Sequence, residues 1–344
     1  MLTIYSEKHR HHNPPYEFLE RGIVPYTEAP ARAETIVSAL AAAGIGPIAP
    51  PDDFGLAPIR AVHADDYLDH LQTIYADWVA VGGTAQAAMP FAFPRADLNG
   101  DAATPYARVG RYAFDMSAPI TATSWDAILA SAQCALTAAQ RVLDGEPVTY
   151  ALCRPPGHHA SQNLMGGYCF LNNAAIAAEF LTRGRRQRVA IVDVDVHHGN
   201  GTQRIFYDRG DVLFVSIHGD PQWEYPYFLG NAHERGDGAG AGATLNFPLE
   251  KGIDNARYLA VLGEALNAVR RFTPDALVVS AGFDTFGGDP LGQFKLTTDA
   301  YREMGRRFAV LGLPTVLVQE GGYAVHALGE NVVNLLQGFA ETPA

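Results

Sequence analysis

The sequence predicts an α/β fold, with one domain built on a central, mostly parallel β-sheet and helices on both faces. In the second half of the chain, short β-branched runs alternate with longer segments of helical spacing, which implies right-handed strand–helix–strand crossovers. The predicted strands are almost wholly apolar, as strands buried on both faces are. No linker, charge run or internal repeat divides the 344 residues, so a single domain spanning 1–344 is predicted.

The first part of the chain is less regular. A strand is predicted at Leu2–Tyr5, and a turn-rich stretch follows at 9–15. Helical spacing predicts helices at Pro30–Ala43, where proline occupies a tolerated first-turn position, and at Ala64–Val79. A short apolar stretch at 57–63 precedes the second helix.

Between residues 82 and 119 the periodicity breaks down. This segment contains two adjacent glycines, several prolines and scattered aromatic residues. Loops of this length are uncommon in compact domains and are usually functional. A long loop insertion is therefore predicted here, acting as a lid or as an interface arm.

From residue 124 onward the helical and strand periods alternate. Helices are predicted at Ser124–Leu143, Asn172–Thr182, Asn255–Arg271 and Asp299–Leu311, with a last one through Leu335, and strands at Val148–Leu152, Val189–Val194, Val212–His218, Ala276–Ser280 and Thr315–Gln319. The glycine-rich run at 236–242 is similar to a dinucleotide fingerprint, but it neither follows a strand nor opens a helix. It is predicted to be a flexible loop.

Composition excludes several classes of function. The net charge is −12, with 25 basic and 37 acidic residues, which disfavours nucleic-acid binding and is mildly favourable to cationic small molecules. The three cysteines, Cys134, Cys153 and Cys169, have no CxxC spacing, so neither a disulfide framework nor a thiolate zinc site is expected. No segment has the length of a membrane span, and the first residues lack signal-peptide character. We expect a cytoplasmic protein.

Chemistry is concentrated where the strand at 189–194 ends. Asp193, Asp195 and His197 follow a fully apolar run at alternate positions, so they lie on one side of the strand. Polar groups at the carboxyl end of a parallel strand open onto the crevice where α/β proteins bind ligands. A buried salt-bridge cluster is the alternative, but so many ionisable groups are costly without a cation or another partner. The stretch therefore predicts a metal site.

Other predicted strands end in reactive residues too. The strand at 148–152 leads to His158 and His159, the one at 276–280 to Asp284, and the one at 315–319 to Tyr323. Because these ends meet at one edge of a parallel sheet, they supply a hydrolytic set. Asp195, His197 and Asp284 suit a catalytic zinc with open positions, the tandem histidines suit acid–base catalysis, and Tyr323 suits donation to an oxyanion. Asp193 and Asn200 are candidates to orient the two imidazoles.

These motifs resemble those of the zinc-dependent deacetylases with an arginase fold, the histone deacetylase superfamily, and within it the bacterial acetylpolyamine amidohydrolases. The resemblance covers essentially the whole chain. It rests on five motifs: Arg154-Pro-Pro-Gly-His-His159, Gly166-Gly-Tyr-Cys-Phe-Leu-Asn-Asn173, Asp193-Val-Asp-Val-His-His-Gly-Asn-Gly201, Ala281-Gly-Phe-Asp284 and Glu320-Gly-Gly-Tyr323.

The resemblance implies a role for each site residue. It implies one Zn²⁺ per subunit on Asp195, His197 and Asp284, tandem catalytic histidines His158 and His159, and Tyr323 as transition-state donor. It also implies a narrow channel walled by Gly167, Tyr168 and Tyr225, and a potassium ion near the zinc held by Asp193, Asp195, His197, Ser216 and Ile217. A homodimer, with the 82–119 insertion at its contact, is expected on the same grounds.

The channel entrance departs from the resembled branch, which places acidic residues there to hold distal ammonium groups. Glu17 fits such a position, whereas the other matching positions are Tyr106 and Ser117, with Asp115 as a possible substitute. We therefore expect a broad amidohydrolase that removes acetyl groups from small amines such as acetylpolyamines and also accepts less charged amides, including acetyl-lysine and aromatic amides.

Two other functions stay open. A dinuclear-metal ureohydrolase on the same fold would need further Asp ligands in place of the tandem imidazoles. A catalytically silent metal-binding protein is not favoured, because no member of the proposed catalytic set is missing. The physiological metal, Zn²⁺ or Fe²⁺, and the physiological substrate are not determined by the sequence.

Overall fold

An eight-stranded parallel sheet forms the centre of the computed structural model, which describes residues 1–19, 22–184 and 188–341. The strand order is β4-β1-β5-β10-β9-β6-β7-β8, and each neighbouring pair runs parallel. The strands are β1 (Leu2–Ile4), β4 (Ile48–Ala49), β5 (Val148–Ala151), β6 (Val189–Asp193), β7 (Val212–Gly219), β8 (Thr244–Leu249), β9 (Ala276–Ala281) and β10 (Thr315–Gln319). The predicted fold class is confirmed.

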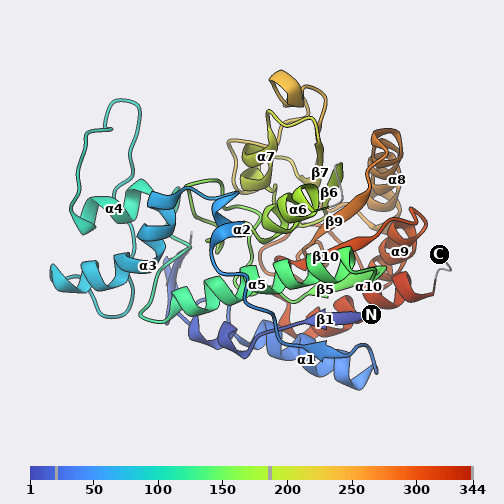
Figure 1. The fold of residues 1–344 in the computed structure, drawn as a ribbon, viewed down its shortest axis with the longest axis horizontal. Coiled ribbons are helices and arrows are strands. Elements are labelled where there is room, and N and C mark those ends of the chain that lie inside the picture. The colour runs from blue at the N-terminus through green and yellow to red at the C-terminus, as the bar shows by residue number, and fades with distance from the viewer. Residues whose placement is uncertain (20–21, 185–187, 342–344) are drawn as a thin grey trace.

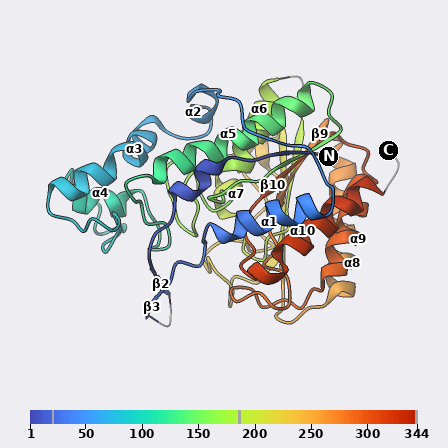
Figure 2. The same cartoon turned by 90° about the horizontal axis from the view of Figure 1, so that it is seen from below.

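Helices cover both faces of this sheet (Figures 1 and 2). One face packs against α1 (Ala31–Ala42), α8 (Asn255–Phe272), α9 (Thr298–Ala309) and α10 (Val325–Ala340). The other packs against α2 (Ala57–Arg60), α3 (Asp65–Ala80), α5 (Ser124–Leu143), α6 (Asn173–Arg183) and α7 (Asn200–Phe206). Two hydrophobic clusters result, one on each side of the sheet.

Alternation along the strands explains both clusters. In β6, Val189 and Ile191 join the cluster under α5 and α6, whereas Ala190 and Val192 join the cluster under α8 and α9. Successive side chains of a strand point to opposite faces, so a run buried on both faces must be apolar throughout. The same alternation sets the side on which Asp193, the last residue of the strand, leaves the sheet.

The predicted 82–119 loop contains a helix, α4 (Pro105–Arg111). Its sequence signal is local: the Thr104 side chain accepts a hydrogen bond from the Ala107 N–H, and Pro105 occupies the first turn. Ala88 also bridges to Ile120 near the ends of the segment. Together α3 and α4 form a lobe that extends from one end of the sheet, which we call the α3–α4 lobe (Figure 1).

Several short elements were not predicted. The strand β8 carries Pro248 and lies at the edge of the sheet, where a missing N–H is tolerated. The helices α2 and α7 have only four and seven residues, and the two-residue strand β4 is too short to show a period. An antiparallel pair, β2 (Glu17–Leu19) and β3 (Gly22–Val24), lies apart from the main sheet. Each is held by tertiary packing rather than by a local pattern.

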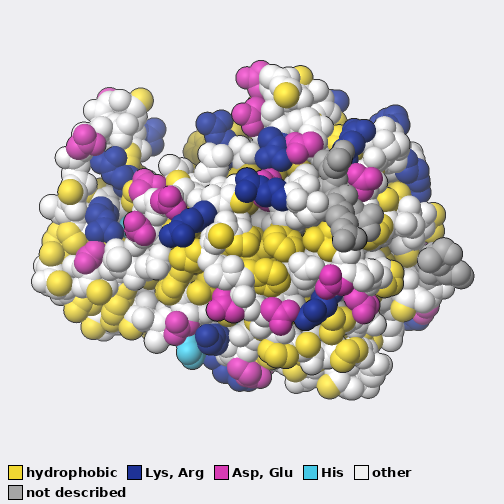
Figure 3. Space-filling view, in the orientation of Figure 1, with side chains coloured by type: hydrophobic (Ala, Val, Ile, Leu, Met, Phe, Trp, Pro, Cys, Tyr) yellow, Lys and Arg dark blue, Asp and Glu magenta, His cyan; other side chains and the backbone are white. Residues whose placement is uncertain are grey.

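The run at 236–242 opens no α-helix, as predicted. It forms a 3₁₀ turn at Gly238–Gly240 and leads into β8. Across the described ranges, every helix is too short or too polar to cross a membrane. On the face shown in Figure 3, basic and acidic side chains are intermixed.

Candidate active site

The predicted site residues meet at the carboxyl edge of the sheet. The strands β5, β10, β9, β6 and β7 lie side by side in that order, although their order along the chain is different. Their ends therefore place the turn at 154–159, Tyr323, Asp284 and the 193–201 stretch next to one another. Asp193, Asp195 and Asp284 are fully buried, so any charge that they carry must be balanced locally.

Asp195, His197 and Asp284 form a compact group of possible metal ligands. One ligand atom from each lies within 4.8 Å of the other two. His197 Nδ1 is 3.1 Å from Asp195 Oδ1 and 3.3 Å from Asp284 Oδ2. The structure thus brings together the three residues predicted as metal ligands.

The surroundings fit a bound cation. Asp284 Oδ2 accepts no hydrogen bond from the described residues, while Asp284 Oδ1 accepts one from the Val196 N–H at 2.8 Å. Burial, and next the nearby Asp195 carboxylate, raise the pKa of Asp284 to about 7. A cation would relieve this repulsion and use the free oxygen. Gly321 is required here, since a Cβ on it would lie 2.0 Å from Asp284 Oδ2.

The tandem histidines have different partners and opposite pKa directions. His158 Nδ1 lies 2.9 Å from Asp193 Oδ2. Burial lowers the pKa of His158, but Asp193 and Asp195 outweigh it and raise the pKa to about 10. The neutral partner of His159 is Asn200, whose Oδ1 is 2.6 Å from Nδ1. Burial, and next the charges of His158 and His197, hold the pKa of His159 well below its usual value.

Gly167 borders the tandem histidines directly. A Cβ at this position, where φ is +54°, would lie 2.2 Å from His159 Cδ2. Only glycine allows the backbone to approach that ring in this conformation.

Tyr323 lies at the end of the Gly321-Gly322 segment and is buried. Its ring centroid is 5.5 Å from that of Tyr168, and burial raises the pKa of Tyr323 well above its usual value. A phenol with a raised pKa stays protonated and can donate a hydrogen bond.

Two residues that the sequence analysis did not single out hold this segment. The Asp289 carboxylate accepts hydrogen bonds from the backbone N–H groups of Tyr323 (2.6 Å) and Ala324 (2.9 Å). Arg32, buried on α1, donates to the carbonyl oxygens of Gly322 and Glu320 at 2.6 Å each and places its guanidinium 4.7 Å from the centroid of the Tyr323 ring. Asp289 follows Asp284 by five residues, a spacing that could have drawn notice, whereas nothing in its local sequence marks Arg32.

Tyr168 and Tyr225, predicted to wall the channel, lie beside Tyr323 and His159 respectively. The Tyr225 ring is 5.0 Å from the His159 ring, at 89°. Asp115 connects both walls, because its Oδ2 accepts hydrogen bonds from the Tyr225 hydroxyl (2.7 Å) and the Gly167 N–H (3.1 Å). Ser117 hydrogen-bonds to both Asp115 oxygens and accepts one from the Tyr168 N–H.

Two predicted entrance residues, Glu17 and Tyr106, have different surroundings. Glu17 is fully buried; its Oε1 accepts a hydrogen bond from the Thr27 N–H at 2.7 Å, and it is the second cause, after burial, of the raised pKa of Tyr168. Glu17 thus lies next to a residue that is predicted to wall the channel. The Tyr106 hydroxyl donates to Val81 O and its ring packs against Trp78 in the α3–α4 lobe. Within one chain, Tyr106 therefore does not contact the predicted channel walls formed by Tyr168 and Tyr225.

The residues predicted to hold potassium come from neighbouring strand ends. Asp193 of β6 pairs in register with Ser216 of β7, which Ile217 follows. The Ser216 hydroxyl lies 2.8 Å from His218 Nδ1, and Asp193 Oδ1 and Asp195 Oδ1 accept the N–H groups of Asp195 and His197. Three of the predicted potassium residues, Asp193, Ser216 and Ile217, thus lie on the adjacent strands β6 and β7, and the other two, Asp195 and His197, belong to the metal-ligand group.

A comparison with known protein families shows to which family this chain belongs. The histone deacetylase domain matches residues 26–339 of this chain. The chain belongs to the histone deacetylase family. Its chemistry is accordingly that of a hydrolytic deacetylase, and deacetylases of this family are generally metal-dependent.

Relatives within the histone deacetylase family match over nearly the full length. Acetylpolyamine amidohydrolase 2 of Pseudomonas aeruginosa is 49% identical over 341 residues, covering 98% of each chain. Acetylpolyamine amidohydrolase 1 of the same organism is 50% identical, covering 98% of this chain and 99% of that one. The crystal structure of an acetylpolyamine aminohydrolase from Burkholderia pseudomallei superimposes with a TM-score of 0.95 at 44% identity, covering 99% of both chains.

Proposed function

We propose that this chain is a zinc-dependent amidohydrolase that removes the acetyl group from small acetylated amines. The observation that carries the proposal is the convergence of the Asp195–His197–Asp284 group with two imidazoles of opposite pKa direction and a protonated phenol. Amide hydrolysis needs a base for the attacking water, an acid for the leaving amine and a donor for the oxyanion. Each is present at this edge of the sheet.

Asp195, His197 and Asp284 would hold the ion. Two carboxylates and one imidazole are typical ligands of a catalytic zinc, which keeps further positions open, and Fe²⁺ is the alternative ion. When bound, such an ion polarises the amide carbonyl and acidifies a water molecule. Potassium is proposed as a structural ion near Asp193, Asp195, His197, Ser216 and Ile217, supported by the alignment of the ends of β6 and β7.

The chain's own residues would divide the proton transfers. His159, which stays neutral, accepts the proton of the attacking water at Nε2, because Nδ1 faces Asn200. His158, paired with Asp193, stays charged and stabilises the negative charge that develops in the transition state. Tyr323 donates its phenolic proton in a hydrogen bond to the carbonyl oxygen. Proton delivery to the departing amine returns the imidazole of His159 to its neutral form.

The proposed substrates are acetylated diamines and polyamines, together with less charged amides. The full-length relatives named acetylpolyamine amidohydrolases support the first group. The net charge of −12 also favours cationic substrates in general. Glu17 is buried, and Asp115 already accepts hydrogen bonds from Tyr225, Gly167 and Ser117. We therefore propose that these two carboxylates select long polycations only weakly. The aromatic side chains can hold an alkylammonium by cation–π contact or a neutral group by apolar burial.

A homodimer formed through the 82–119 segment is proposed as well. The segment carries exposed large hydrophobic residues, Phe91 and Leu98, each about two-thirds exposed, and Tyr106 at 39%. Apolar side chains gathered on a surface are typical of protein interfaces. A cytoplasmic location stays a prediction of the sequence.

A kinetic panel tests the proposal. The wild-type enzyme, loaded with zinc, is assayed with acetylputrescine, acetylspermidine, an acetyl-lysine peptide and a neutral aromatic acetamide. We expect turnover of the acetylated diamine, preference for the longer polyamine below about tenfold, and some hydrolysis of the neutral amide. Absence of turnover on all four would refute the proposal. Two divalent transition-metal ions per chain by metal analysis, rather than one, would instead favour the dinuclear ureohydrolase.

A further inference from the structure

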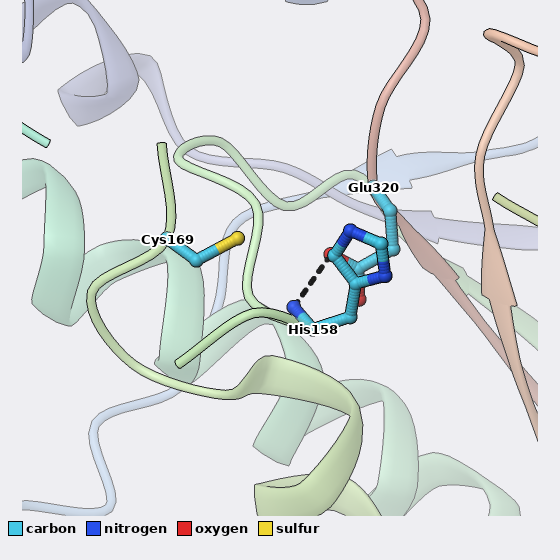
Figure 4. A group of neighbouring side chains, drawn as sticks. All are labelled: His158, Cys169 and Glu320. Carbon is cyan, nitrogen blue, oxygen red and sulfur yellow. Dashed lines mark hydrogen bonds between the residues drawn. The ribbon is translucent and has the colours of Figure 1, made fainter. Parts of the chain in front are cut away.

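One of the tandem histidines, His158, neighbours Cys169 and Glu320, and the three side chains have donor atoms that could hold a metal ion (Figure 4). Each already has another use. His158 Nδ1 faces Asp193, the Cys169 thiol donates to the Gly167 carbonyl oxygen at 3.3 Å, and Glu320 binds backbone N–H groups. Each residue thus has a contact within the protein, and we consider the role of the buried carboxylate in these contacts.

Glu320 binds the turn that carries the tandem histidines. Its Oε2 accepts hydrogen bonds from the N–H of Gly157 (2.7 Å) and the N–H of His158 (3.1 Å); Figure 4 marks the second. The side chain is fully buried, and its Oε1 has no partner among the described residues. One oxygen atom thus satisfies two consecutive buried donors, each of which would be costly if unpaired.

The same residue is tied to the segment that carries Tyr323. Glu320 directly follows β10, its N–H donates to Ala281 O of β9 at 3.1 Å, and its carbonyl oxygen accepts the Arg32 hydrogen bond. The next residue, Gly321, donates its N–H to Asp195 Oδ2 at 2.8 Å. Glu320 is consequently a direct connection between the histidine turn on one side and the Tyr323 segment and the metal-ligand group on the other.

We infer that Glu320 is a positioning residue for deacetylation: its carboxylate holds the His158–His159 turn in register with Tyr323 and with the metal ligands. This inference rests on the proposed function. The feature that matters is an acceptor oxygen at this reach from β10, because Oε2 serves two backbone N–H donors. The charge of Glu320 also favours the protonated form of His158, but Asp193 and Asp195 favour it more strongly.

Three substitutions separate reach from charge. Glu320→Gln keeps an acceptor oxygen at the same reach and removes the charge. Glu320→Asp keeps the charge but shortens the side chain by one methylene, which withdraws the oxygen from both N–H groups. Glu320→Ala removes the acceptor. The matched control is Asn331→Ala, which removes a buried polar side chain of α10 that accepts a hydrogen bond from Thr298 at the start of α9.

The measurements are kcat and KM on an acetylated diamine, zinc content and thermal unfolding. We expect Glu320→Ala to lower kcat by about 10- to 100-fold, as lost orienting partners do, with KM changed less than roughly threefold and zinc retained. Glu320→Gln should keep a higher kcat than Glu320→Asp. Asn331→Ala should lower the unfolding temperature without lowering kcat. If Glu320→Ala does not fold, the inference is tested by whether the kcat of Glu320→Gln exceeds that of Glu320→Asp.

A double-mutant cycle provides the last test. In a His159→Ala background, Glu320→Ala should cost less than roughly threefold, because a residue that acts through another has little effect once that other is gone. The inference is overturned if Glu320→Asp is more active than Glu320→Gln, or if Glu320→Ala changes KM alone. It is also overturned if the kcat loss of the double mutant equals the product of the losses of His159→Ala and Glu320→Ala. Absence of wild-type turnover would refute the proposed function, and that outcome is distinct from these.

Discussion

Replacing Asp284 tests the metal assignment most directly. In Asp284→Ala the chain keeps one carboxylate, Asp195, and one imidazole, His197, as ligands. The Val196 N–H, which donates to Asp284 Oδ1 at 2.8 Å, also loses its acceptor. Asp284→Asn retains a carbonyl oxygen for that N–H but removes the negative charge. The two variants therefore share the loss of an anionic ligand and differ in the hydrogen bond.

The expected magnitudes follow from these contacts. Since loss of an orienting partner alone weakens metal binding by about 10- to 100-fold, loss of a direct anionic ligand should weaken zinc binding at least that much in both variants. The unpaired Val196 N–H should further lower the free energy of unfolding of Asp284→Ala by about 1–3 kcal/mol relative to Asp284→Asn. Relief of the repulsion with Asp195 acts in the opposite direction in both variants.

The assay combines zinc analysis after dialysis against a weak chelator with urea unfolding in excess strong chelator. The second measurement isolates the hydrogen bond from the metal. Asp299→Ala, an exposed aspartate on α9, serves as the control and should keep both zinc and stability. Full zinc occupancy in Asp284→Ala under these conditions would show that the ion does not depend on Asp284, and the assignment would be wrong.

Four further predictions concern other parts of the molecule. His159→Ala should lower kcat by ~10²–10⁴-fold, the usual contribution of general acid–base catalysis, and near-normal turnover would contradict its role. Asp289→Ala should lower kcat by about tenfold or more, yet have little effect in a Tyr323→Phe background, because Asp289 acts through the Tyr323 backbone; equal losses in both backgrounds would refute this. Burial lowers the pKa of His63 to about 4, and its Nε2 accepts a hydrogen bond from the Asn172 N–H, so the imidazole stays neutral in the native protein but binds a proton in the unfolded chain below pH 6.5. The free energy of unfolding should therefore fall by about 3 kcal/mol between pH 6.5 and 4 because of this group. Urea unfolding of His63→Gln should show a correspondingly smaller dependence on pH. Deleting residues 95–102 should convert the dimer to a monomer in sedimentation analysis, whereas a monomeric wild-type protein at micromolar concentration would contradict the interface.

Local patterns in the sequence were enough to predict the sheet, most of the helices and the residues of the proposed catalytic set. A strand buried on both faces must be apolar, so the runs that become β6, β7, β9 and β10 stand out, and their abrupt polar ends mark Asp195, Asp284 and Tyr323. Asp193 and Asn200 were predicted to orient the two imidazoles, and the structure places Asp193 within hydrogen-bond distance of His158 and Asn200 within that of His159. Short elements such as α4 and β8 were missed because a few residues do not show a period.

Only the tertiary structure decided how these pieces meet. The sheet order β5-β10-β9-β6 differs from the order along the chain, and no local pattern specifies it. That order brings Arg32 and Asp289 to the Tyr323 segment and Glu320 to the histidine turn. The structure also buries Glu17 next to Tyr168 and places Tyr106 in the α3–α4 lobe. Burial and long-range hydrogen bonds depend on contacts between residues far apart in sequence, which is why residue types and spacing alone do not specify these surroundings.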